Sequence, residues 1–319
     1  MSTSNMKRLS TGSNIPMLGL GTWKSQPGEV KAAVETAIDE GYRHIDCALL
    51  YDNENEVGEA IEIKIKEGKV KREDLFITTK LWSTYYRKVR EGFDKSLRRL
   101  KLEYVDLYML HWPFALQFTT EKDFFPVDDQ GNAKLDEDID YIEVYREIEK
   151  LQKKGLTKAI GLSSFNEYQI DRIFKEVDIK PAVHQFEIHP YLDQESLVKH
   201  SQSKGMVVTG YSTFGSPDRP WAQPGDPTLL DNPELQNIAD KYGKTVAQVL
   251  LRYQLQRDIV VIPKSVTASR IKSNAAVFDF NLEKEDMTRI KKFNRNWRAV
   301  SVPAFTPHKY YPFKEKYTE

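Results

Sequence analysis

The sequence predicts an α/β fold, a (β/α)8 TIM barrel with an N-terminal β-hairpin and long loops at the C-terminal face of the barrel. Strand-like and helix-like segments alternate along the chain, which indicates a parallel sheet with right-handed crossovers. The strand-like segments are almost continuously apolar, as expected for strands buried on both faces. Eight such units in roughly 250 residues favour a closed barrel over an open sheet. The 319 residues (1–319) are therefore expected to form a single domain.

The hairpin is expected over residues 7–18, where two short strand-like segments flank the turn residues 11–14. After it, strands are expected at 42–48, 74–82, 104–112, 157–164, 180–190, 206–212, 258–265 and 277–280. The helices that precede them are expected at 28–41, 57–65, 89–100, 141–155, 166–177, 193–205, 245–256 and 267–275. In the first helix, apolar residues recur on one face, at Val30, Ala33, Val34, Ala37 and Ile38, and Gly41 ends the pattern.

Three long segments are expected at the mouth of this barrel: the loops 112–139 and 213–233 and the C-terminal tail 294–319. Long loops in a compact domain are often functional. These segments are therefore expected to shape the substrate and cofactor sites.

Charge and composition exclude several classes of partner. Lysines and arginines number 47, and aspartates and glutamates also number 47, so no nucleic-acid or acidic-membrane partner is expected. The single cysteine, Cys47, allows no intramolecular disulfide, which fits a reducing compartment. No apolar run approaches the ~18 residues of a membrane helix, and the N-terminus has no apolar signal region. A soluble, cytoplasmic protein is expected.

Ionisable side chains are expected together at the C-terminal ends of three successive strands, where barrel enzymes carry their catalytic groups. They are Asp46, Tyr51, Lys80 and His111. Each alone has a structural explanation, as an interfacial tyrosine, an ion pair or a core histidine, and only their joint occurrence favours catalysis. An ammonium beside the phenol would lower its pKa from about 10, while Asp46 would keep Lys80 charged. A neutral His111 could orient a carbonyl oxygen, so the group is suited to protonating an oxygen.

The attacking species is not evident among the side chains. Cys47 lies within a strand beside Asp46 and is expected to be a small core residue. Lys80 could form a Schiff base, as in barrel aldolases, but its expected pairing with Asp46 argues for a charged lysine. A cofactor is therefore the expected electron source.

A nucleotide phosphate site is expected after the strand 258–265. The G-x-G at Gly19 and Gly21 and the "GKT" at 243–245 match neither a Rossmann fingerprint nor a P-loop. By contrast, two cations and two hydroxyls lie beside the start of a helix, which favours an anion: Lys264, Ser265, Thr267 and Arg270. A solvated basic helix start is the alternative explanation. Polar groups at other strand ends could hold a nicotinamide ring: Ser163, Ser164, Gln185, Tyr211 and Ser212.

These residues lie in motifs by which the whole chain resembles the aldo-keto reductase superfamily, most closely its aldose/aldehyde reductase branch. The motifs include "GLGTWKS", "GYRHIDCALLYDNENEVGEAI", "LFITTKLW", "DLYMLHWP", "AIGLSSFN", "YSTFGSPDRPW", "VVIPKS" and "FNRNWR". The resemblance implies a monomeric NADPH-dependent carbonyl reductase that acts on a small molecule and needs no metal. It implies that Tyr51 is the general acid, that Lys80 and Asp46 tune it, and that His111 orients the carbonyl.

The resemblance also implies the cofactor contacts. Tyr211 would stack on the nicotinamide, while Lys264, Ser265 and Arg270 would bind the 2′-phosphate; Lys24, Asp218 and Lys264 look like the belt over the pyrophosphate. The full implied set is Gly21, Thr22, Trp23, Lys24, Asp46, Ser163, Ser164, Gln185, Tyr211, Ser212, Phe214, Ser216, Asp218, Lys264, Ser265, Val266, Thr267, Arg270 and Asn274. The chain departs from the family pattern at Ser164, His184 and Ser273.

Aromatic residues on the expected mouth loops and tail indicate an apolar substrate pocket, although aromatics in the core are the alternative. The expected lining is Trp23, Leu50, Tyr51, Trp82, His111, Trp112, Phe125, Trp221, Trp297, Val300 and Val302, with Phe124 nearby. Aliphatic or aromatic aldehydes fit such a pocket, as do steroid or ecdysteroid-like ketones, and aldoses less well. The other interpretations are a non-catalytic NADPH-binding protein and a Schiff-base aldolase using Lys80.

Overall fold

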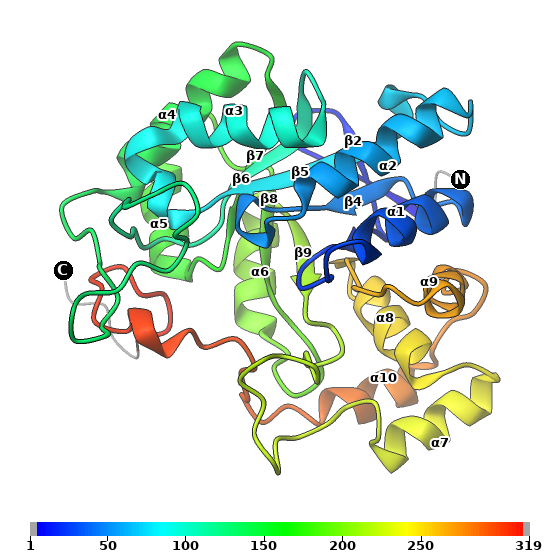
Figure 1. Cartoon of the computed structure of the whole chain (residues 1–319). Helices are drawn as coiled ribbons and strands as arrows, with labels where there is room; N and C mark the ends of the chain where they lie inside the picture. Colours follow the sequence, from blue (N-terminus) through cyan, green and yellow to red (C-terminus); the bar gives the residue numbers. More distant parts are fainter. Residues whose placement is uncertain (1–4, 315–319) are drawn as a thin grey trace.

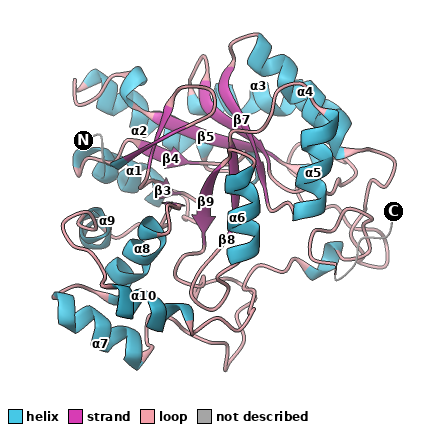
Figure 2. Ribbon diagram, turned by 180° about the vertical axis from the view of Figure 1, so that it is seen from behind, coloured by secondary structure: helices cyan, strands magenta, loops and turns pink. Residues whose placement is uncertain are grey.

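The predicted barrel is confirmed in a computed structural model that describes residues 5–314 (Figures 1 and 2). Its main sheet has eight strands within the described part of the chain, joined in the order β3 to β10 and all parallel. Their bounds are β3 (Leu20–Gly21), β4 (His44–Asp46), β5 (Phe76–Leu81), β6 (Val105–Leu110), β7 (Thr157–Ser163), β8 (Val183–Glu187), β9 (Val207–Tyr211) and β10 (Val260–Val261).

The sheet closes on itself between its first and last strands. Parallel bridges join Leu18 to Val261 and Gly21 to Lys264, and the N–H of Gly19 donates to the carbonyl of Val261 at 2.8 Å. A Cβ atom on Gly21 would lie 2.6 Å from the carbonyl oxygen of Ile262, so only glycine allows the strands to meet this closely. The glycine identity of residue 21 therefore has a structural cause in barrel closure.

The predicted hairpin is confirmed, but one predicted strand is wrong. The strands β1 (Met6–Arg8) and β2 (Asn14–Pro16) pair antiparallel, as expected. Residues 277–280 form no strand. The missing barrel strand is β3, which follows the hairpin directly and is only two residues long, so it has too few apolar positions to give a signal of its own. Counted around the barrel, β10 is therefore the eighth strand.

Helices lie outside the sheet in the order α1 (Glu29–Asp39), α2 (Glu54–Lys66), α3 (Val89–Leu100), α4 (Tyr141–Lys153), α5 (Glu167–Glu176), α6 (Glu195–Ser203), α7 (Pro233–Tyr242), α8 (Val246–Gln256), α9 (Ala268–Ala275) and α10 (Lys284–Lys291). The sequence interpretation did not identify α7 and α10. The sequence does carry local signals for α7, since Asn232 followed by Pro233 is typical of a helix start. In the structure the Asn232 side chain accepts hydrogen bonds from the first turn of α7. A capping box between Thr245 and Gln248 begins α8.

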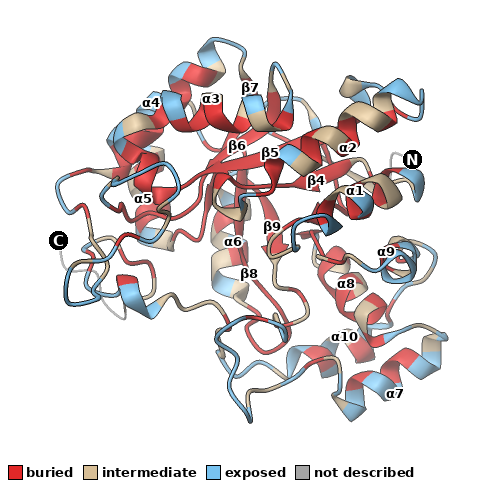
Figure 3. Ribbon diagram, in the orientation of Figure 1, coloured by how far each residue is buried: buried red, intermediate tan, exposed pale blue. Residues whose placement is uncertain are grey.

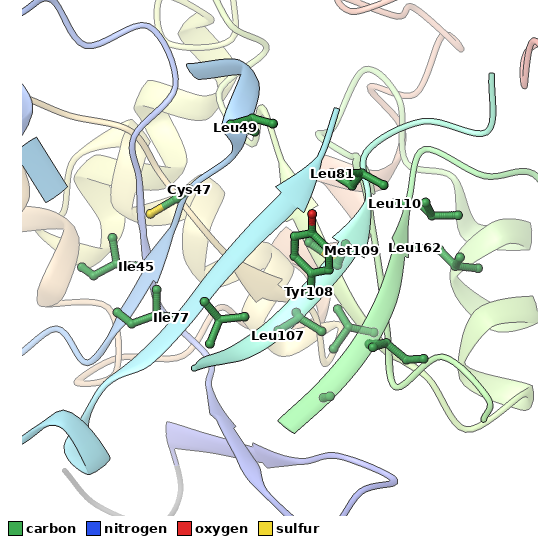
Figure 4. Close-up of a cluster of buried hydrophobic side chains, with 14 of the residues drawn as sticks. Ile45, Cys47, Leu49, Ile77, Leu81, Leu107, Tyr108, Met109, Leu110 and Leu162 are labelled. Carbon is green, nitrogen blue, oxygen red and sulfur yellow. The ribbon is translucent and has the colours of Figure 1, made fainter. Parts of the chain in front are cut away.

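The core fills the barrel and the space between strands and helices. Every residue of β5 and β6 is buried, and Figure 3 shows the strands as an almost continuous buried region. Cys47 is fully buried beside Ile45 and Ile77 (Figure 4), and burial together with the nearby Glu54 and Asp46 raises its pKa well above the usual range. The expectation that Cys47 is a core residue is confirmed.

The tail 294–314 runs from α10 to α5, as its red trace shows in Figure 1. Side chains at the start of α5 hold it: Asn166 donates to the carbonyl of Pro312 at 3.1 Å, and Gln169 donates to that of Tyr310 at 2.9 Å. Residues 315–319 of the predicted tail lie outside the described residues. No helix within residues 5–314 combines the length and apolar character that crossing a membrane requires.

Close packing between α2 and α3 gives the first testable prediction. We expect Gly58→Ala to destabilise the fold by about 1–3 kcal/mol, because the added Cβ would lie 2.6 Å from the backbone of Arg99 and Leu100. That cost exceeds the roughly 1 kcal/mol by which alanine is the better helix former. Urea unfolding of the two proteins measures the difference.

The matched control is Asn237→Ala, an exposed position within α7. It should stabilise the protein by a few tenths of a kcal/mol, roughly the propensity difference alone. A Gly58→Ala protein as stable as the wild type would contradict the packing argument.

Candidate active site

The structure brings the four predicted catalytic residues together at the C-terminal ends of adjacent strands. Asp46 ends β4, Lys80 is the penultimate residue of β5, and His111 follows β6 directly. Tyr51 is carried by the short 3-10 helix Leu49–Tyr51 that follows β4. Because β4, β5 and β6 are neighbours in the sheet, residues up to 65 positions apart share one site.

Lys80 is the centre of this group and has no exposed surface. Its ammonium donates to Asp46 Oδ1 at 2.5 Å, to the carbonyl of Cys47 at 2.8 Å and to the Tyr51 hydroxyl at 3.3 Å. An ammonium has three N–H donors and no acceptor, so all three protons have a partner. The pairing of Lys80 with Asp46, expected from the sequence, is present.

Asp46 is fixed from several sides. Its Oδ2 accepts a hydrogen bond from Gln185 on β8 at 2.8 Å. Its carbonyl accepts hydrogen bonds from the hydroxyl of Thr22 at 2.8 Å and from the N–H of Thr22 at 3.2 Å. Both residues were expected as cofactor contacts, and here they hold the carboxylate that partners Lys80.

Tyr51 differs from the sequence expectation in its ionisation. Burial and then the negative charge of Asp46 raise its pKa well above the usual value. The expectation that Lys80 lowers this pKa is therefore wrong for the structure, because burial raises the pKa most and the carboxylate paired with Lys80 raises it further. Tyr51 is therefore a protonated phenol at neutral pH.

His111 is neutral, as the sequence interpretation required. Burial and then the nearby Lys80 charge lower its pKa well below the usual value. Its ring meets the Tyr51 ring edge-on, with centroids 5.8 Å apart, and the Trp82 ring in the same manner at 5.3 Å. The imidazole and the phenol therefore border the same space.

The residues expected to hold a nicotinamide lie on β7, β8 and β9 and in the loops after β7 and β9. The hydroxyls of Ser164 and Tyr211 are 3.1 Å apart, and those of Ser212 and Ser216 are 2.8 Å apart. Ser164, Ser212 and Ser216 all have positive φ angles, between 47° and 60°. Non-glycine residues rarely adopt this conformation, and it is concentrated at ligand sites. Ser163 is buried at the end of β7.

The residues expected to hold phosphates surround the start of α9. Lys264 and Ser265 follow β10, and Thr267 is the residue before the helix. Neither Lys264 nor Arg270 forms an ion pair with any described residue, whereas Lys24 lies 3.6 Å from Asp218 across the mouth. Unpaired cations, a hydroxyl and a helix start form a suitable donor set for the phosphates of a dinucleotide. Val266 lies between Ser265 and Thr267 in the chain, the buried Asn274 lies further along α9, and Phe214 lies in the loop after β9.

The expected substrate pocket is lined in part by interlocking aromatic rings. Trp82 lies edge-on to Phe125 at 5.3 Å, and Trp23 lies 5.9 Å from Trp221. Phe125 and Trp221 are more than 40% exposed, so the rim is open to ligands. Trp112 is buried and stacks on Phe114, with the ring centroids 5.4 Å apart, which agrees with the alternative that this aromatic residue belongs to the core. Leu50, Trp297, Val300 and Val302 are partly buried.

Sequence reasoning missed two residues that shape this region. Phe305 stacks on Phe125 at 6.4 Å and packs against Phe114 at 4.7 Å. Glu187 ends β8 and binds the tail. Their signals were weak, since Phe305 lies in an irregular tail and Glu187 looks like an ordinary polar residue within an apolar run.

Two of the departures, His184 and Ser273, form contacts within the fold. His184 is fully buried, and its Nδ1 lies 2.9 Å from the hydroxyl of Ser201 on α6. Burial lowers the pKa of His184 to about 3, so it is a neutral structural residue. Ser273 lies on α9, and its carbonyl accepts a hydrogen bond from Gln248.

Known proteins are similar to this chain in sequence and in fold. A family model described as the aldo/keto reductase family matches residues 17–295. Aldo-keto reductase family 1 member A1 of Gallus gallus is 48% identical over 97% of both chains, and that of Xenopus tropicalis is 49% identical over the same share. The solved structure of the aldose reductase from Schistosoma japonicum superimposes with a TM-score of 0.91, at 44% identity, over 98% of this chain and 99% of that one. The chain belongs to the aldo/keto reductase family and is an NADP-dependent oxidoreductase.

Proposed function

We propose that this protein reduces aldehydes and ketones to alcohols with NADPH, and that Tyr51 is the proton donor. The observation that carries the proposal is the direction of the hydrogen bond between Lys80 and Tyr51. Because an ammonium can only donate, the Tyr51 oxygen accepts, and its own O–H remains free to donate elsewhere. The space bordered by the phenol and by His111 is where a carbonyl oxygen would receive that proton.

Bound NADPH would supply the hydride for the carbonyl carbon. The chain's own residues would do the rest. The neutral imidazole of His111 would hydrogen-bond the carbonyl oxygen and hold it against the Tyr51 hydroxyl. As negative charge develops on that oxygen, Tyr51 would transfer its proton, and the resulting phenolate would be stabilised by the Lys80 ammonium at 3.3 Å.

The preference for NADPH over NADH is assigned to Lys264, Ser265 and Arg270. Arg270 is exposed at the first turn of α9 and has no carboxylate partner among the described residues. A guanidinium with free donors suits a phosphate monoester, which NADPH has and NADH lacks. Lys24 and Asp218, 3.6 Å apart, would close over the pyrophosphate.

Apolar carbonyl compounds are the proposed substrates. Aromatic rings dominate the rim, which favours aliphatic and aromatic aldehydes and flat ketones such as oxo-steroids or ecdysteroid-like compounds over aldoses.

A monomer in the cytoplasm remains part of the proposal. A Schiff-base aldolase is disfavoured, because all three Lys80 protons are engaged and a neutral amine would be required. The complete set of four ionisable groups argues against a purely non-catalytic NADPH-binding role.

The proton-donor role predicts the effect of Tyr51→Phe. We expect kcat to fall by about 10²–10⁴-fold, since only proton donation is removed, while the Kd for NADPH changes less than about threefold. Steady-state rates from NADPH absorbance and cofactor titration by fluorescence quenching give both values. Tyr145→Phe is the control, because the Tyr145 hydroxyl donates to Ile179 on the outside of the barrel. A Tyr51→Phe enzyme that keeps most of its turnover would refute the role.

The pKa shifts predict the pH profile of the reduction. His111 has a lowered pKa, so it stays neutral as pH falls towards about 6. Tyr51 has a raised pKa, so it stays protonated as pH rises to about 9. We expect kcat/KM to be flat between about pH 6 and 9 and to fall only at higher pH, when the phenol ionises. A descending limb centred near pH 7 to 8 would contradict the raised phenol pKa.

The cofactor assignment predicts a selective effect of Arg270→Ala. We expect the Kd for NADPH to rise about 10- to 100-fold, the loss of one charge-assisted contact, and the Kd for NADH to change less than about threefold. Lys272→Ala is the control, since Lys272 is an exposed cation two residues along the same helix that lies 3.7 Å from Glu40. Equal losses for both cofactors would show that Arg270 does not read the 2′-phosphate.

A further inference from the structure

A buried carboxylate at the barrel mouth has no part in the proposed proton transfer. Glu187 is the last residue of β8 and has no exposed surface. Its Oε1 accepts a hydrogen bond from the backbone N–H of Ala299 at 2.7 Å, and its Oε2 accepts one from that of Val300 at 2.9 Å. Two successive amides of the C-terminal tail are therefore held by one side chain of the barrel.

The surroundings of Glu187 support a charged acceptor. His189 donates to Oε1 from its Nε2 at 2.9 Å, and the guanidinium of Arg298 lies 4.0 Å from Oε2. Hydrogen bonds to an ionised acceptor are about twice as strong as those between neutral groups. A buried carboxylate with three N–H donors and a nearby cation is thus a strong anchor for the tail.

The same stretch of tail is held from its other side. The indole N–H of Trp221 donates to the carbonyl of Ala299 at 2.7 Å, and the Tyr311 hydroxyl donates to that of Ser301 at 2.5 Å. Val302 follows with a φ of 46°, which a β-branched residue adopts only when its surroundings impose it. The tail at 299–302 is therefore a strap with a fixed backbone path.

Glu187 also links this strap to the expected nicotinamide site. It pairs with Tyr211 in the β8–β9 ladder, and the N–H of Ile188 donates to the Tyr211 carbonyl at 3.1 Å. One strand end therefore sets both the place of the Tyr211 ring and the place of residues 299 and 300. The backbone of Tyr211 is tied to the end of β8 through the strand ladder, and the tail is tied to it through the Glu187 side chain.

We propose that Glu187 is a positioning residue that fixes the tail at residues 299–300 and thereby decides how large a carbonyl substrate the pocket accepts. The proposal rests on the proposed reductase function. It acts through the side chains that follow on the strap, Val300 and Val302, which were expected to line the pocket. Glu187 itself touches neither the reacting atoms nor the four ionisable groups of the site.

The test compares Glu187→Gln with the wild type on a small aldehyde, propanal, and on a bulky aryl ketone. Glutamine keeps the shape but loses the charge, and its NH2 group cannot accept from a backbone amide. We expect the KM for the ketone to rise about tenfold, while kcat/KM for propanal and the Kd for NADPH each change less than about threefold. Hydrogen exchange at the amides of Ala299 and Val300 should become about tenfold faster.

Glu149→Gln is the matched control. Glu149 is a buried carboxylate on α4 that accepts a hydrogen bond from the backbone N–H of Ile179, remote from the tail. It should leave the ratio of the two substrates and the exchange of the tail unchanged, whatever it does to stability.

Equal changes for both substrates, or unchanged exchange at Ala299 and Val300, would overturn the proposal. If Glu187→Gln does not fold, Glu187→Asp, which keeps the charge but withdraws it by one methylene, is expected to give the same pattern. Fast exchange of the two amides in the wild type would overturn the anchor without any variant. A wild type that oxidises NADPH with neither carbonyl compound would instead refute the proposed function, and the exchange measurement would still report on the anchor.

Discussion

The site depends on one buried ion pair, between Lys80 and Asp46, and on the fact that an ammonium cannot accept a hydrogen bond. Lys80 donates one N–H to Asp46 and one to the Cys47 carbonyl, which leaves a single N–H for Tyr51. That bond orients the phenol oxygen as acceptor and leaves the phenol proton for a ligand. Removing Asp46 would leave an uncompensated buried cation, which typically costs about 3–5 kcal/mol. The same pair therefore supports both the fold of the barrel mouth and the direction of proton donation.

The paired cation also explains why the acid is a neutral phenol rather than a phenolate. A free ammonium near the hydroxyl would lower its pKa, but here the carboxylate offsets the charge and burial raises the pKa of Tyr51. A high pKa keeps the proton available across the neutral range. Once charge develops on a neighbouring oxygen, the hydrogen bond from Lys80 favours the phenolate that forms. In the proposed reaction, the arrangement would therefore stabilise the charge that develops on the phenol oxygen more than the neutral phenol of the resting site.

The sequence was sufficient for the barrel and for the four ionisable groups, because both follow from strand ends that meet at one face. It was insufficient where the decisive contacts are between segments distant in the chain or too short to show a pattern. Two-residue β3 was replaced by a false strand at 277–280. The raised pKa of Tyr51 depends on burial, which one sequence does not give. Gln185 was expected as a cofactor contact, and its hydrogen bond to Asp46, 139 residues away, could not be read from any local pattern.

In the role proposed for it, Glu187 affects which substrates the pocket accepts and does not take part in the proton transfer. It binds the tail through the N–H groups of residues 299 and 300, so the anchor is independent of which side chains the tail carries. Substitutions at Val300, Val302 or Phe305 could therefore reshape the pocket while the strap keeps its path. The four ionisable groups lie on or shortly after β4, β5 and β6, and none of their hydrogen bonds involves the part of the tail that the structure describes, 294–314. If the proposed function and the role proposed for Glu187 hold, a barrel with this construction could accept a different carbonyl compound while the proton transfer stays the same.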